Sequence, residues 1–496
     1  MVKNIHNFRD FLDFYCKKNN ENIFFLSETK NEEISYNDLW IIMKNFNFFF
    51  QKYNISSENK VLVLLDNSLE LLITFLSSLY NSRIFVPINP NSGQNEINYI
   101  IKKTKPKLIV TSRQFKKKVN KLKSIKKFII DKNIIKNLLK KNFNFKNERK
   151  IKKKNSISKI LFTSGSTGNP KGVVLTEKSM LTNLFDICEA LNIKKKNPKF
   201  LSITPLYHNN GQFIPTLLPI ILNGSTFTIS PDISLLNFWP TCKKFQINFS
   251  SVMATHINYF NTINKITKHS IEALFCGGAK LDKQSQKRFE KKFGIKVLCN
   301  YGLTETSSIA STESLYKKKY CYGSVGRVLK NTKVKIKKNS SGHGEILIKG
   351  ENLFKNYYGD KHLTKSKLSN KWFSTGDIGF FDKKKNLHIK DRLDNMIIVS
   401  GENIYPSDVE NYTNNYKYIS LGIVCSVPDK ITQNKLIFLY EGEKKIKYDL
   451  FYKYLKPKVA RHKIPKVIYH VNEIGLNEIP KAPNKKILRN KIKNIL

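Results

Sequence analysis

The sequence predicts an α/β protein: a large N-terminal domain of layered α/β subdomains with a small β-rich subdomain, and a small C-terminal α+β domain. Three observations predict this fold. In the N-terminal part, short apolar runs typical of strands alternate with stretches of helical apolar spacing. From about residue 320 to 390 the pattern changes to short strands with turns, and the residues after about 394 alternate separately. The 496 residues are enough for roughly two to four domains of ~100–200 residues.

The first elements follow from apolar spacing. Lys60–Leu65 (KVLVLL) predicts a buried strand, and Ser68–Tyr80 has the spacing of a helix. Further strands are predicted at Arg83–Ile88 and Lys107–Thr111, with a helix at Gln94–Lys103 between them. This alternation indicates strands covered by helices.

A second group of elements surrounds a polar turn. A strand at Lys159–Phe162 ends at this glycine-rich turn, and a strand at Lys171–Leu175 and a helix at Ser179–Leu191 follow it. Two Lys- and Asn-rich stretches, 116–155 and 331–344, are interpreted instead as weakly ordered linkers or surface.

The last hundred residues predict a domain of their own. Helices are expected at Val409–Asn414 and Tyr448–Leu455, and strands at Ile419–Val427 and Leu436–Glu441. We therefore expect a small α+β domain.

The chain is strongly basic, with 87 Lys and Arg against 38 Asp and Glu and a net charge of +49. Only nine of the basic residues are Arg, the residue expected for bidentate contacts to bases. Because Lys, Asn and Ile are all abundant, the charge indicates compositional drift and solvated surface, and no nucleic-acid partner is expected. An acidic partner, such as a phosphate-rich ligand, an anionic membrane or RNA, is the alternative.

Other classes of protein are disfavoured. No apolar run approaches the ~18–20 residues that cross a bilayer, and the first residues carry no apolar signal region. The seven cysteines include no CxxC pair, which argues against a disulfide framework and a zinc site. We expect a cytoplasmic protein.

The polar turn is the strongest chemical signal. Thr163–Gly172 (TSGSTGNPKG) contains four hydroxyls, three glycines and one lysine. Glycines let backbone N–H groups approach a polyanion, hydroxyls add donors, and Lys171 adds a mobile charge. The spacing is not that of a Walker loop. A flexible Ser/Gly turn is the alternative interpretation.

This segment resembles the signature loop of the adenylate-forming superfamily, which includes acyl-CoA synthetases, amino-acid adenylation domains and luciferases. The resemblance extends over nearly the whole chain, from Ile34–Leu39 and Leu65–Pro90 onwards. Further matches follow in the family's order: Pro205–Gly211 (PLYHNNG), Gly277–Ala279 (GGA), Tyr301–Glu305 (YGLTE), Ser374–Asp377 (STGD), Asp391–Glu410 (DRLDNMIIVSGENIYPSDVE) and Pro480–Arg489 (PKAPNKKILR).

The resemblance implies two half-reactions that use ATP, Mg²⁺ and coenzyme A. A carboxylate attacks the α-phosphate of MgATP to give an acyl-adenylate and pyrophosphate, and a thiol then displaces AMP to give a thioester. It also implies a nucleotide-binding set: Thr163, Ser164, Gly165, Ser166, Thr167, Gly168, Lys171, Gly278, Ala279, Tyr301, Gly302, Thr304, Asp377 and Arg392.

Particular roles are implied for residues of this set and for Glu305. Tyr301 would stack on adenine, Thr304 would bond a phosphate oxygen, and Glu305 would ligate Mg²⁺, a hard cation that prefers carboxylate oxygen. Gly278 and Ala279 would form a floor beside the adenine, where a larger side chain would collide. A capping or surface carboxylate is the alternative for Glu305.

The ribose and the interdomain hinge are assigned in the same way. Asp377 would accept bonds from the ribose hydroxyls, with an Asx-type turn as the alternative. Arg392 would also reach the nucleotide, and Asp394 matches the family's hinge position, with a structural ion pair as the alternative for both. The implied domains are 1–391, a hinge at 392–394 and a mobile lid at 395–496.

Lys486 matches the lid lysine that neutralises charge on the α-phosphate. Two departures from the family accompany it. Lys485 stands where glycine is usual and could substitute for Lys486, and Asp391 stands where glycine usually precedes the hinge arginine. His208 matches the residue that gates the acyl site, although a lone histidine is often structural.

The thiol acceptor is inferred from Val399–Pro406 (VSGENIYP), which resembles the CoA-ligase form of the loop after the hinge. Ser400 and Gly401 would contact the pantetheine of coenzyme A. An acyl-CoA synthetase is therefore expected. A ligase that loads a carrier protein is one alternative, and a non-catalytic basic module for nucleic acid or anionic membrane on a degenerate scaffold is the other.

Overall fold

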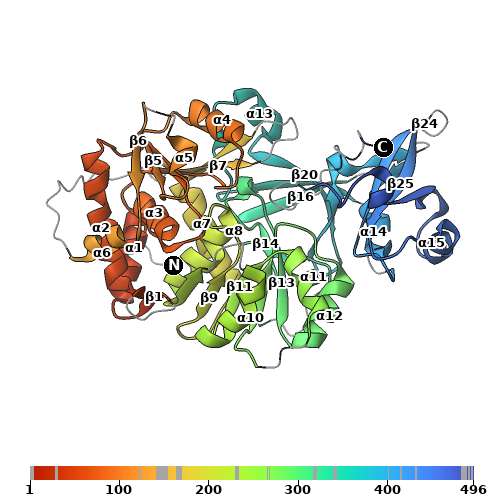
Figure 1. The fold of residues 1–496 in the computed structure, drawn as a ribbon, viewed down its shortest axis with the longest axis horizontal. Coiled ribbons are helices and arrows are strands. Elements are labelled where there is room, and N and C mark those ends of the chain that lie inside the picture. The colour runs from red at the N-terminus through yellow and green to blue at the C-terminus, as the bar shows by residue number, and fades with distance from the viewer. Residues whose placement is uncertain are drawn as a thin grey trace. The chain divides into compact units, whose positions relative to one another are not determined.

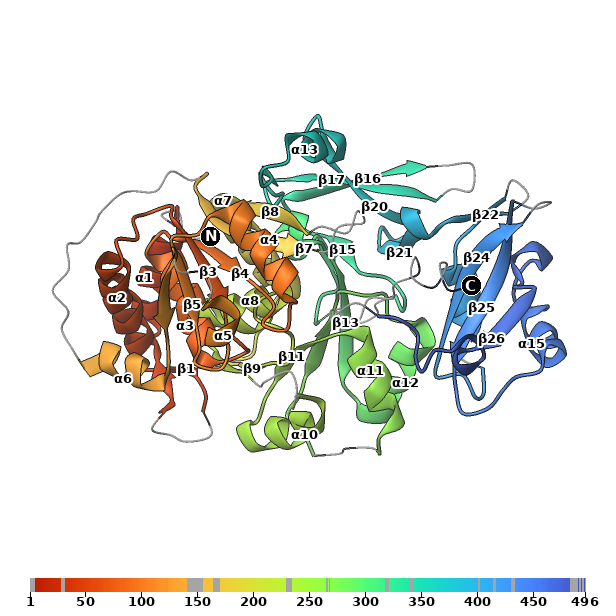
Figure 2. The same ribbon diagram turned by 45° about the horizontal axis from the view of Figure 1, so that its top comes forward.

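The computed structural model describes residues 5–27, 32–120, 122, 124–140, 155–163, 170–228, 234–264, 266, 268–316, 321–338, 343–399, 402–413, 416–429, 433–481, 489, 492 and 495. The chain divides into two compact units (Figures 1 and 2). The first comprises Met1–Val334, Ile348–Phe373 and Asp382–Leu387, and the second Lys335–Leu347, Ser374–Phe381 and His388–Leu496. The mixed α/β architecture confirms the predicted fold class.

Among the described residues, the first unit holds a seven-stranded sheet in the order β18-β8-β7-β4-β3-β5-β6. Its central strands are parallel, whereas β7 pairs antiparallel with β8 and β8 with β18. The strands are β3 (Lys60–Leu64), β4 (Ile84–Pro87), β5 (Leu108–Thr111), β6 (Lys126–Ile129), β7 (Ile157–Thr163), β8 (Lys171–Thr176) and β18 (Asn356–Tyr357).

A second sheet of this unit, nine-stranded within the described residues, has the order β15-β14-β13-β12-β11-β9-β10-β1-β2. The strands from β13 to β1 run parallel. They are β1 (Ile23–Phe25), β2 (Ile34–Ser35), β9 (Lys199–Ser202), β10 (Ser225–Thr228), β11 (Phe249–Val252), β12 (Ala273–Cys276), β13 (Lys296–Tyr301), β14 (Ser311–Thr312) and β15 (Arg327–Val328).

Helices cover both faces of these sheets. In β3, Val61 and Val63 enter one core cluster while Leu62 and Leu64 enter another, which is why the strand is apolar from Val61 to Leu64. Helix α7 contacts strands of both sheets, and α12 packs on β13 (Figure 1). The helices are α1 (Phe8–Lys18), α2 (Tyr36–Lys52), α3 (Leu69–Tyr80), α4 (Gln94–Thr104), α5 (Lys116–Val119), α6 (Lys132–Lys140), α7 (Glu177–Leu191), α8 (Asn209–Gln212), α9 (Leu218–Leu222), α10 (Ser234–Phe245), α11 (Ala254–Thr262), α12 (Lys283–Phe293) and α13 (Lys361–Lys367), with a π-helical turn at Phe213–Leu217 between α8 and α9.

The predicted strands and helices around residues 60–111 and 159–191 are confirmed, most to within about two residues. Capping explains some of the helix starts, since the side chains of Ser68 and Thr176 accept backbone N–H groups at the starts of α3 and α7. Among the described residues, no helix is both long and apolar enough to span a membrane.

The prediction of weakly ordered linkers was wrong where the structure describes them. Within 116–155, β6 pairs with β5 and is followed by α6. Val119, Phe128, Ile130, Ile135 and Leu138 are buried, so a few apolar side chains anchor a stretch whose lysines are mostly exposed. Within 331–344, Thr332–Lys338 forms β16, whose exposed lysines alternate with half-buried apolar residues.

In the second unit and its junctions with the first, the predicted β-rich region is a five-stranded sheet among the described residues. Its order is β16-β17-β20-β19, with β21 also paired to β20. The strands after β16 are β17 (Gly344–Gly350), β19 (Leu368–Ser369), β20 (Trp372–Phe381) and β21 (Leu387–Arg392). Strands β16, β17, β20 and β21 contribute residues to both units.

The C-terminal residues form the predicted α+β arrangement. A hairpin of β22 (Ile397–Val399) and β23 (Glu402–Ile404) precedes α14 (Ser407–Thr413). Strands β24 (Leu421–Asp429), β25 (Gln433–Glu441) and β26 (Val467–His470) form a sheet, with α15 (Tyr448–Leu455) between the last two in sequence. The predicted strands and helices of this region are confirmed. The domain boundaries at 391 and 395 stay predictions.

A half-buried ion pair anchors the end of the chain in this unit. The Arg489 guanidinium contacts the Glu410 carboxylate, which also accepts the Val424 N–H at 2.7 Å. Burial raises the pKa of Glu410, and the positive charge of Arg489 opposes that shift. The charge of Arg489 therefore stabilises the ionised form of a carboxylate that burial disfavours.

Replacing Arg489 by methionine is expected to lower the free energy of unfolding of this unit by about 3–5 kcal/mol, because it leaves a buried carboxylate without its cation. Urea unfolding followed by hydrogen exchange in β24 measures the change. The matched control is Lys445→Met, which breaks a more exposed pair with Glu473 in the same unit and should cost less than about 1 kcal/mol. Equal losses in the two variants would contradict a stabilising role for the Arg489 pair.

Candidate active site

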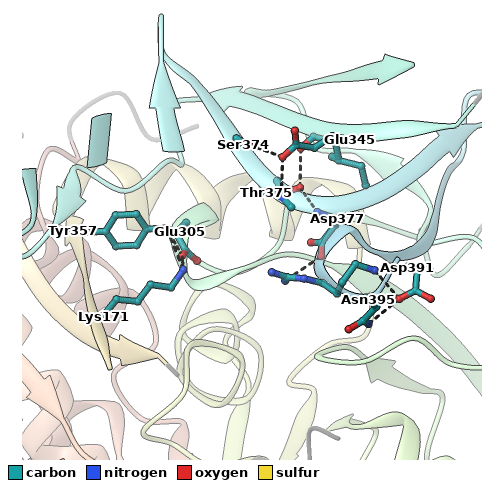
Figure 3. Close-up of polar contacts among 12 residues, drawn as sticks. Lys171, Glu305, Glu345, Tyr357, Ser374, Thr375, Asp377, Asp391 and Asn395 are labelled. Carbon is teal, nitrogen blue, oxygen red and sulfur yellow. Dashed lines mark hydrogen bonds and ion pairs between the residues drawn. The ribbon is translucent and has the colours of Figure 1, made fainter. Parts of the chain in front are cut away.

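Three side chains from distant segments of the first unit meet in one cluster (Figure 3). Lys171 begins β8, Glu305 lies in the 3₁₀ turn Thr304–Thr306 after β13, and Tyr357 ends β18. Lys171 Nζ lies 3.1 Å from Glu305 Oε1, and the Tyr357 hydroxyl donates to the same oxygen at 2.7 Å. Lys171 Nζ also donates to the Tyr357 hydroxyl at 3.3 Å.

Backbone geometry explains why these side chains meet. Strand β18 pairs antiparallel with β8, with Tyr357 opposite Val173, which places Tyr357 beside the start of β8. The segment before β18 is also bonded to the turn that carries Glu305, because the Phe354 N–H donates to the Glu305 carbonyl at 2.8 Å. At Gly302, a Cβ would lie 1.8 Å from the Ser308 carbonyl oxygen, so only glycine lets the loop carrying Glu305 fold back.

The cluster suits a metal-bound polyphosphate. Glu305 is 4% exposed, and carboxylate oxygen is the ligand that Mg²⁺ prefers. Lys171 keeps a partly exposed side chain, so its ammonium can also reach an anion. A buried carboxylate beside a lysine and a tyrosine is not the surface or capping group considered as the alternative for Glu305.

Sequence reasoning did not single out Tyr357. In the segment NYYGD, Tyr357 and Tyr358 stand side by side and nothing in the pattern distinguishes them. Only the pairing of β18 with β8 shows which of the two lies against Glu305.

Replacing Tyr357 by phenylalanine is expected to lower adenylate formation about 10–100-fold, because a hydrogen bond to a charged group contributes about 1.5–3 kcal/mol. Acid-dependent pyrophosphate exchange at several Mg²⁺ concentrations measures it. Tyr358→Phe is the matched control. Equal rates in the two variants would rule out a positioning role for Tyr357.

The phosphate loop itself lies largely outside the described residues. Ser164, Gly165, Ser166, Thr167 and Gly168 belong to the segment 164–169 that the structure does not describe, so their roles stay predictions.

The strands at both ends of the loop are described. Thr163 ends β7 directly opposite Lys171 in β8. The Thr163 hydroxyl is buried and has no hydrogen-bond partner among the described residues, and its role in binding phosphate stays a prediction.

The predicted adenine floor lies at the end of the nine-stranded sheet. Gly277–Ala279 directly follow β12, and Tyr301 ends the adjacent parallel strand β13. The carboxyl ends of parallel strands meet at one edge of a sheet, so these residues share that edge. Tyr301 is buried, and Gly278 and Ala279 are exposed.

The backbone conformation explains glycine at position 278, and the collision of a larger side chain with adenine stays a prediction. A Cβ on Gly278 would meet no protein atom within 4 Å, and its φ of +80° accounts for glycine there. The tight position is Gly277, where a Cβ would lie 2.3 Å from Asn300 Oδ1.

In the second unit, Arg392 and Asp377 form an ion pair of 3.0 Å between Nη1 and Oδ1 (Figure 3). Asp377 is buried at 5% exposure, and its N–H donates to Thr375 Oγ1 at 3.0 Å. Gly376, with φ of +73°, donates to the Glu345 carboxylate at 3.0 Å. These bonds fix the turn that presents the Asp377 carboxylate. The structural ion pair considered for Arg392 is therefore present, and its nucleotide role stays a prediction.

Asp391, which departs from the family pattern, makes hydrogen bonds that stabilise the backbone at the predicted hinge. Asp391 Oδ1 accepts from the Arg392 N–H at 2.7 Å and from Asn395 Nδ2 at 2.9 Å, and Oδ2 accepts from the Ser407 N–H at 3.0 Å. Asp394 is exposed in the turn Leu393–Asn395. Its hinge role stays a prediction, as do the roles of Ser400, Gly401, Lys485 and Lys486, which lie outside the described residues.

His208 precedes helix α8 in the predicted gate segment, Pro205–Gly211. Its ring centroid lies 4.7 Å from that of Tyr207, and burial lowers the pKa of His208 to about 4. The imidazole is therefore neutral near pH 7. Gly211 is required for close approach, since a Cβ there would lie 2.4 Å from the Pro205 carbonyl oxygen. Whether His208 gates the acyl site stays a prediction.

The α/β fold thus brings Lys171, at the start of β8, next to the buried carboxylate of Glu305. The family described as "AMP-binding enzyme" matches residues 13–358. The chain belongs to this family, which confirms the resemblance seen in the sequence.

Individual relatives agree with this assignment. The chain is 30% identical to a 2-succinylbenzoate–CoA ligase of Staphylococcus epidermidis over 67% of this chain and 69% of that protein. It is 26% identical to a long-chain-fatty-acid–CoA ligase of Bacillus subtilis over 93% and 90%. The solved o-succinylbenzoate CoA synthetase of B. subtilis, in complex with its acyl-adenylate, shares the fold with a TM-score of 0.86 and 22% identity over 98% of both chains. ATP-bound MatB of Rhodopseudomonas palustris has a TM-score of 0.85 and 19% identity, also over 98% of both.

Proposed function

We propose that this protein is an acid–thiol ligase that activates a carboxylic acid with ATP and transfers the acyl group to coenzyme A. The acid attacks the α-phosphate of MgATP, pyrophosphate leaves, and the thiol then displaces AMP from the acyl-adenylate. The observation that most supports the proposal is the meeting of Lys171 with Glu305 at the end of the strands that hold the phosphate loop. Membership of the AMP-binding enzyme family supports the same reaction.

Residues of the first unit would make most of the contacts to Mg²⁺ and the phosphates of ATP. Glu305 would hold Mg²⁺, which neutralises charge on the phosphates when bound, and Lys171 would bond the pyrophosphate end. Thr163, Thr304 and the hydroxyls of the loop would donate to phosphate oxygens. Catalysis of this kind rests on positioning and charge neutralisation.

Other segments of the chain would bind the adenine, the ribose and the α-phosphate. Tyr301, Gly302, Gly278 and Ala279 would surround the adenine. Asp377 would accept from the ribose hydroxyls, with Arg392 as its neighbour. Lys486 would approach the α-phosphate when the lid rotates about Asp394.

Coenzyme A is the proposed thiol. The loop Val399–Pro406, with Ser400 and Gly401, has the CoA-ligase form, and the relatives named above are CoA ligases. A carrier protein is the alternative thiol. We place the reaction in the cytoplasm.

A panel of carboxylic acids assayed for ATP-dependent AMP release, with and without coenzyme A, tests the proposal. We expect at least one acid to give AMP and a free acyl-CoA in equal amounts. Acid-dependent pyrophosphate exchange without any acyl-CoA would favour a carrier protein. No acid-dependent AMP release or pyrophosphate exchange, together with salt-sensitive binding to RNA or anionic vesicles, would overturn the enzyme in favour of a binding module.

A further inference from the structure

Lys159 is an unusual residue in the middle of strand β7, because its side chain is fully buried. Lysine is almost never fully buried unless it is paired. Its Nζ contacts two amide oxygens, Asn209 Oδ1 and Gln212 Oε1. The rings of Phe75 and Phe213 also lie near Nζ, with centroids at 5.8 and 5.6 Å.

The surroundings suit an amine without a counter-ion. Burial lowers the pKa of Lys159 well below its ordinary value, which favours the neutral amine. A neutral amine has two N–H donors, and these match the two amide oxygens of Asn209 and Gln212. Both donors of such an amine would be paired with amide oxygens, whereas Asn209 Nδ2 has no hydrogen-bond partner among the described residues.

The contacts continue from Lys159 into the predicted gate segment. Because Gln212 turns its oxygen toward Lys159, its Nε2 faces the Leu206 carbonyl and donates to it at 2.7 Å. The Leu206 N–H in turn donates to Asn67 Oδ1 at 2.7 Å. Lys159 thus sets the orientation of the Gln212 amide, and the bond from this amide to Leu206 closes the loop that contains His208.

Strand β7 also leads directly to the phosphate loop. It ends at Thr163, where that loop begins, four residues after Lys159. The same strand therefore carries the phosphate loop at its end and the support of the gate segment in its middle.

We propose that Lys159 is a positioning residue that holds the gate segment and helix α8 in place against strand β7 and thereby sets the affinity for the carboxylic acid. This inference rests on the proposed function. Lys159 acts through Asn209 and Gln212.

The first test is Lys159→Met, which keeps the length of the side chain and removes its donors. The KM for the acid is expected to rise at least tenfold, since misplacing a binding group by about 1 Å can cost ~10²-fold. The KM for ATP should change less than about twofold. Amide hydrogen exchange should accelerate at Leu206–Gln212 and remain unchanged in β25. Lys178→Met, which removes a half-exposed lysine paired with Glu351, is the matched control and should alter neither KM.

A double variant separates positioning from stability. Lys159→Met with Asn209→Leu replaces both partners of one buried bond, which removes the unpaired amide oxygen at residue 209 and keeps the Gln212 bond to the Leu206 carbonyl. Thermal stability should recover relative to Lys159→Met, while the high KM for the acid should remain. If the KM recovers together with stability, the positioning role is overturned. This variant also supplies the readout if the single variant does not fold.

The outcome for the proposed function is read separately. If the wild-type protein shows no acid-dependent AMP release, the proposed ligase function is contradicted. The amide hydrogen exchange of Lys159→Met can still be measured in that case. Unchanged exchange at Leu206–Gln212 in Lys159→Met overturns the positioning role, whatever the reaction. In an active enzyme, a KM for the acid within twofold of wild type overturns it as well.

Discussion

Replacing Glu305 by glutamine is expected to lower the rate of adenylate formation by about 10²–10³-fold, the loss typical of removing one group that stabilises developing charge. Glutamine keeps the shape of the side chain and an oxygen that can accept from Tyr357. It removes the negative charge that lies 3.1 Å from Lys171 and that Mg²⁺ would need. The Mg²⁺ concentration for half-maximal rate should therefore rise as well.

Acid-dependent pyrophosphate exchange across a Mg²⁺ titration measures both effects of Glu305→Gln. Glu351→Gln is the matched control, because Glu351 is an exposed partner of Lys178 in the same unit. Its rate and Mg²⁺ dependence should equal those of the wild type. An unchanged Mg²⁺ dependence in Glu305→Gln would remove Glu305 from the metal site.

Replacing Lys486 by alanine is expected to abolish adenylate formation while sparing the second half-reaction. A lysine brought by the lid would neutralise the α-phosphate only while the acid attacks it, a loss we place at about 10²-fold or more. Thioester formation takes place after the lid has moved, so acyl-adenylate supplied from outside should still react with coenzyme A at nearly the wild-type rate.

The control for this experiment is Lys485→Ala. Lys485 stands beside Lys486 where the family usually has glycine, and it is the residue that could substitute. If Lys485→Ala loses adenylation and Lys486→Ala keeps it, the assignment passes to Lys485. Equal loss of both half-reactions in Lys486→Ala would contradict the moving lid.

The secondary structure was largely predictable because apolar spacing dictates it. Strand β3 is apolar on both faces since both enter cores, and α3 begins at its capping serine. The errors came from composition. Lysines around Phe128, Ile135 and Leu138 concealed a strand and a helix, because a few buried side chains suffice to anchor them.

The candidate site was predictable only where a motif marks it. Lys171 and Glu305 lie in recognisable segments and do meet. Tyr357 and Lys159 carry no motif, since their positions depend on strand pairing and on side chains distant in sequence. In the sequence, a lysine next to an apolar run indicates the exposed end of a strand. Only the structure shows that the Lys159 side chain is fully buried.

The central claim, attack of a carboxylate on the α-phosphate, is tested most directly by isotope transfer. The acid is labelled with ¹⁸O in its carboxylate and incubated with the protein, MgATP and coenzyme A, and the nucleotide product is analysed by mass spectrometry. The proposed reaction predicts one labelled oxygen in AMP, because the bridging oxygen remains on phosphorus when the thiol attacks the carbonyl. Acyl-CoA formed with unlabelled AMP, or with ADP and labelled phosphate, would contradict it.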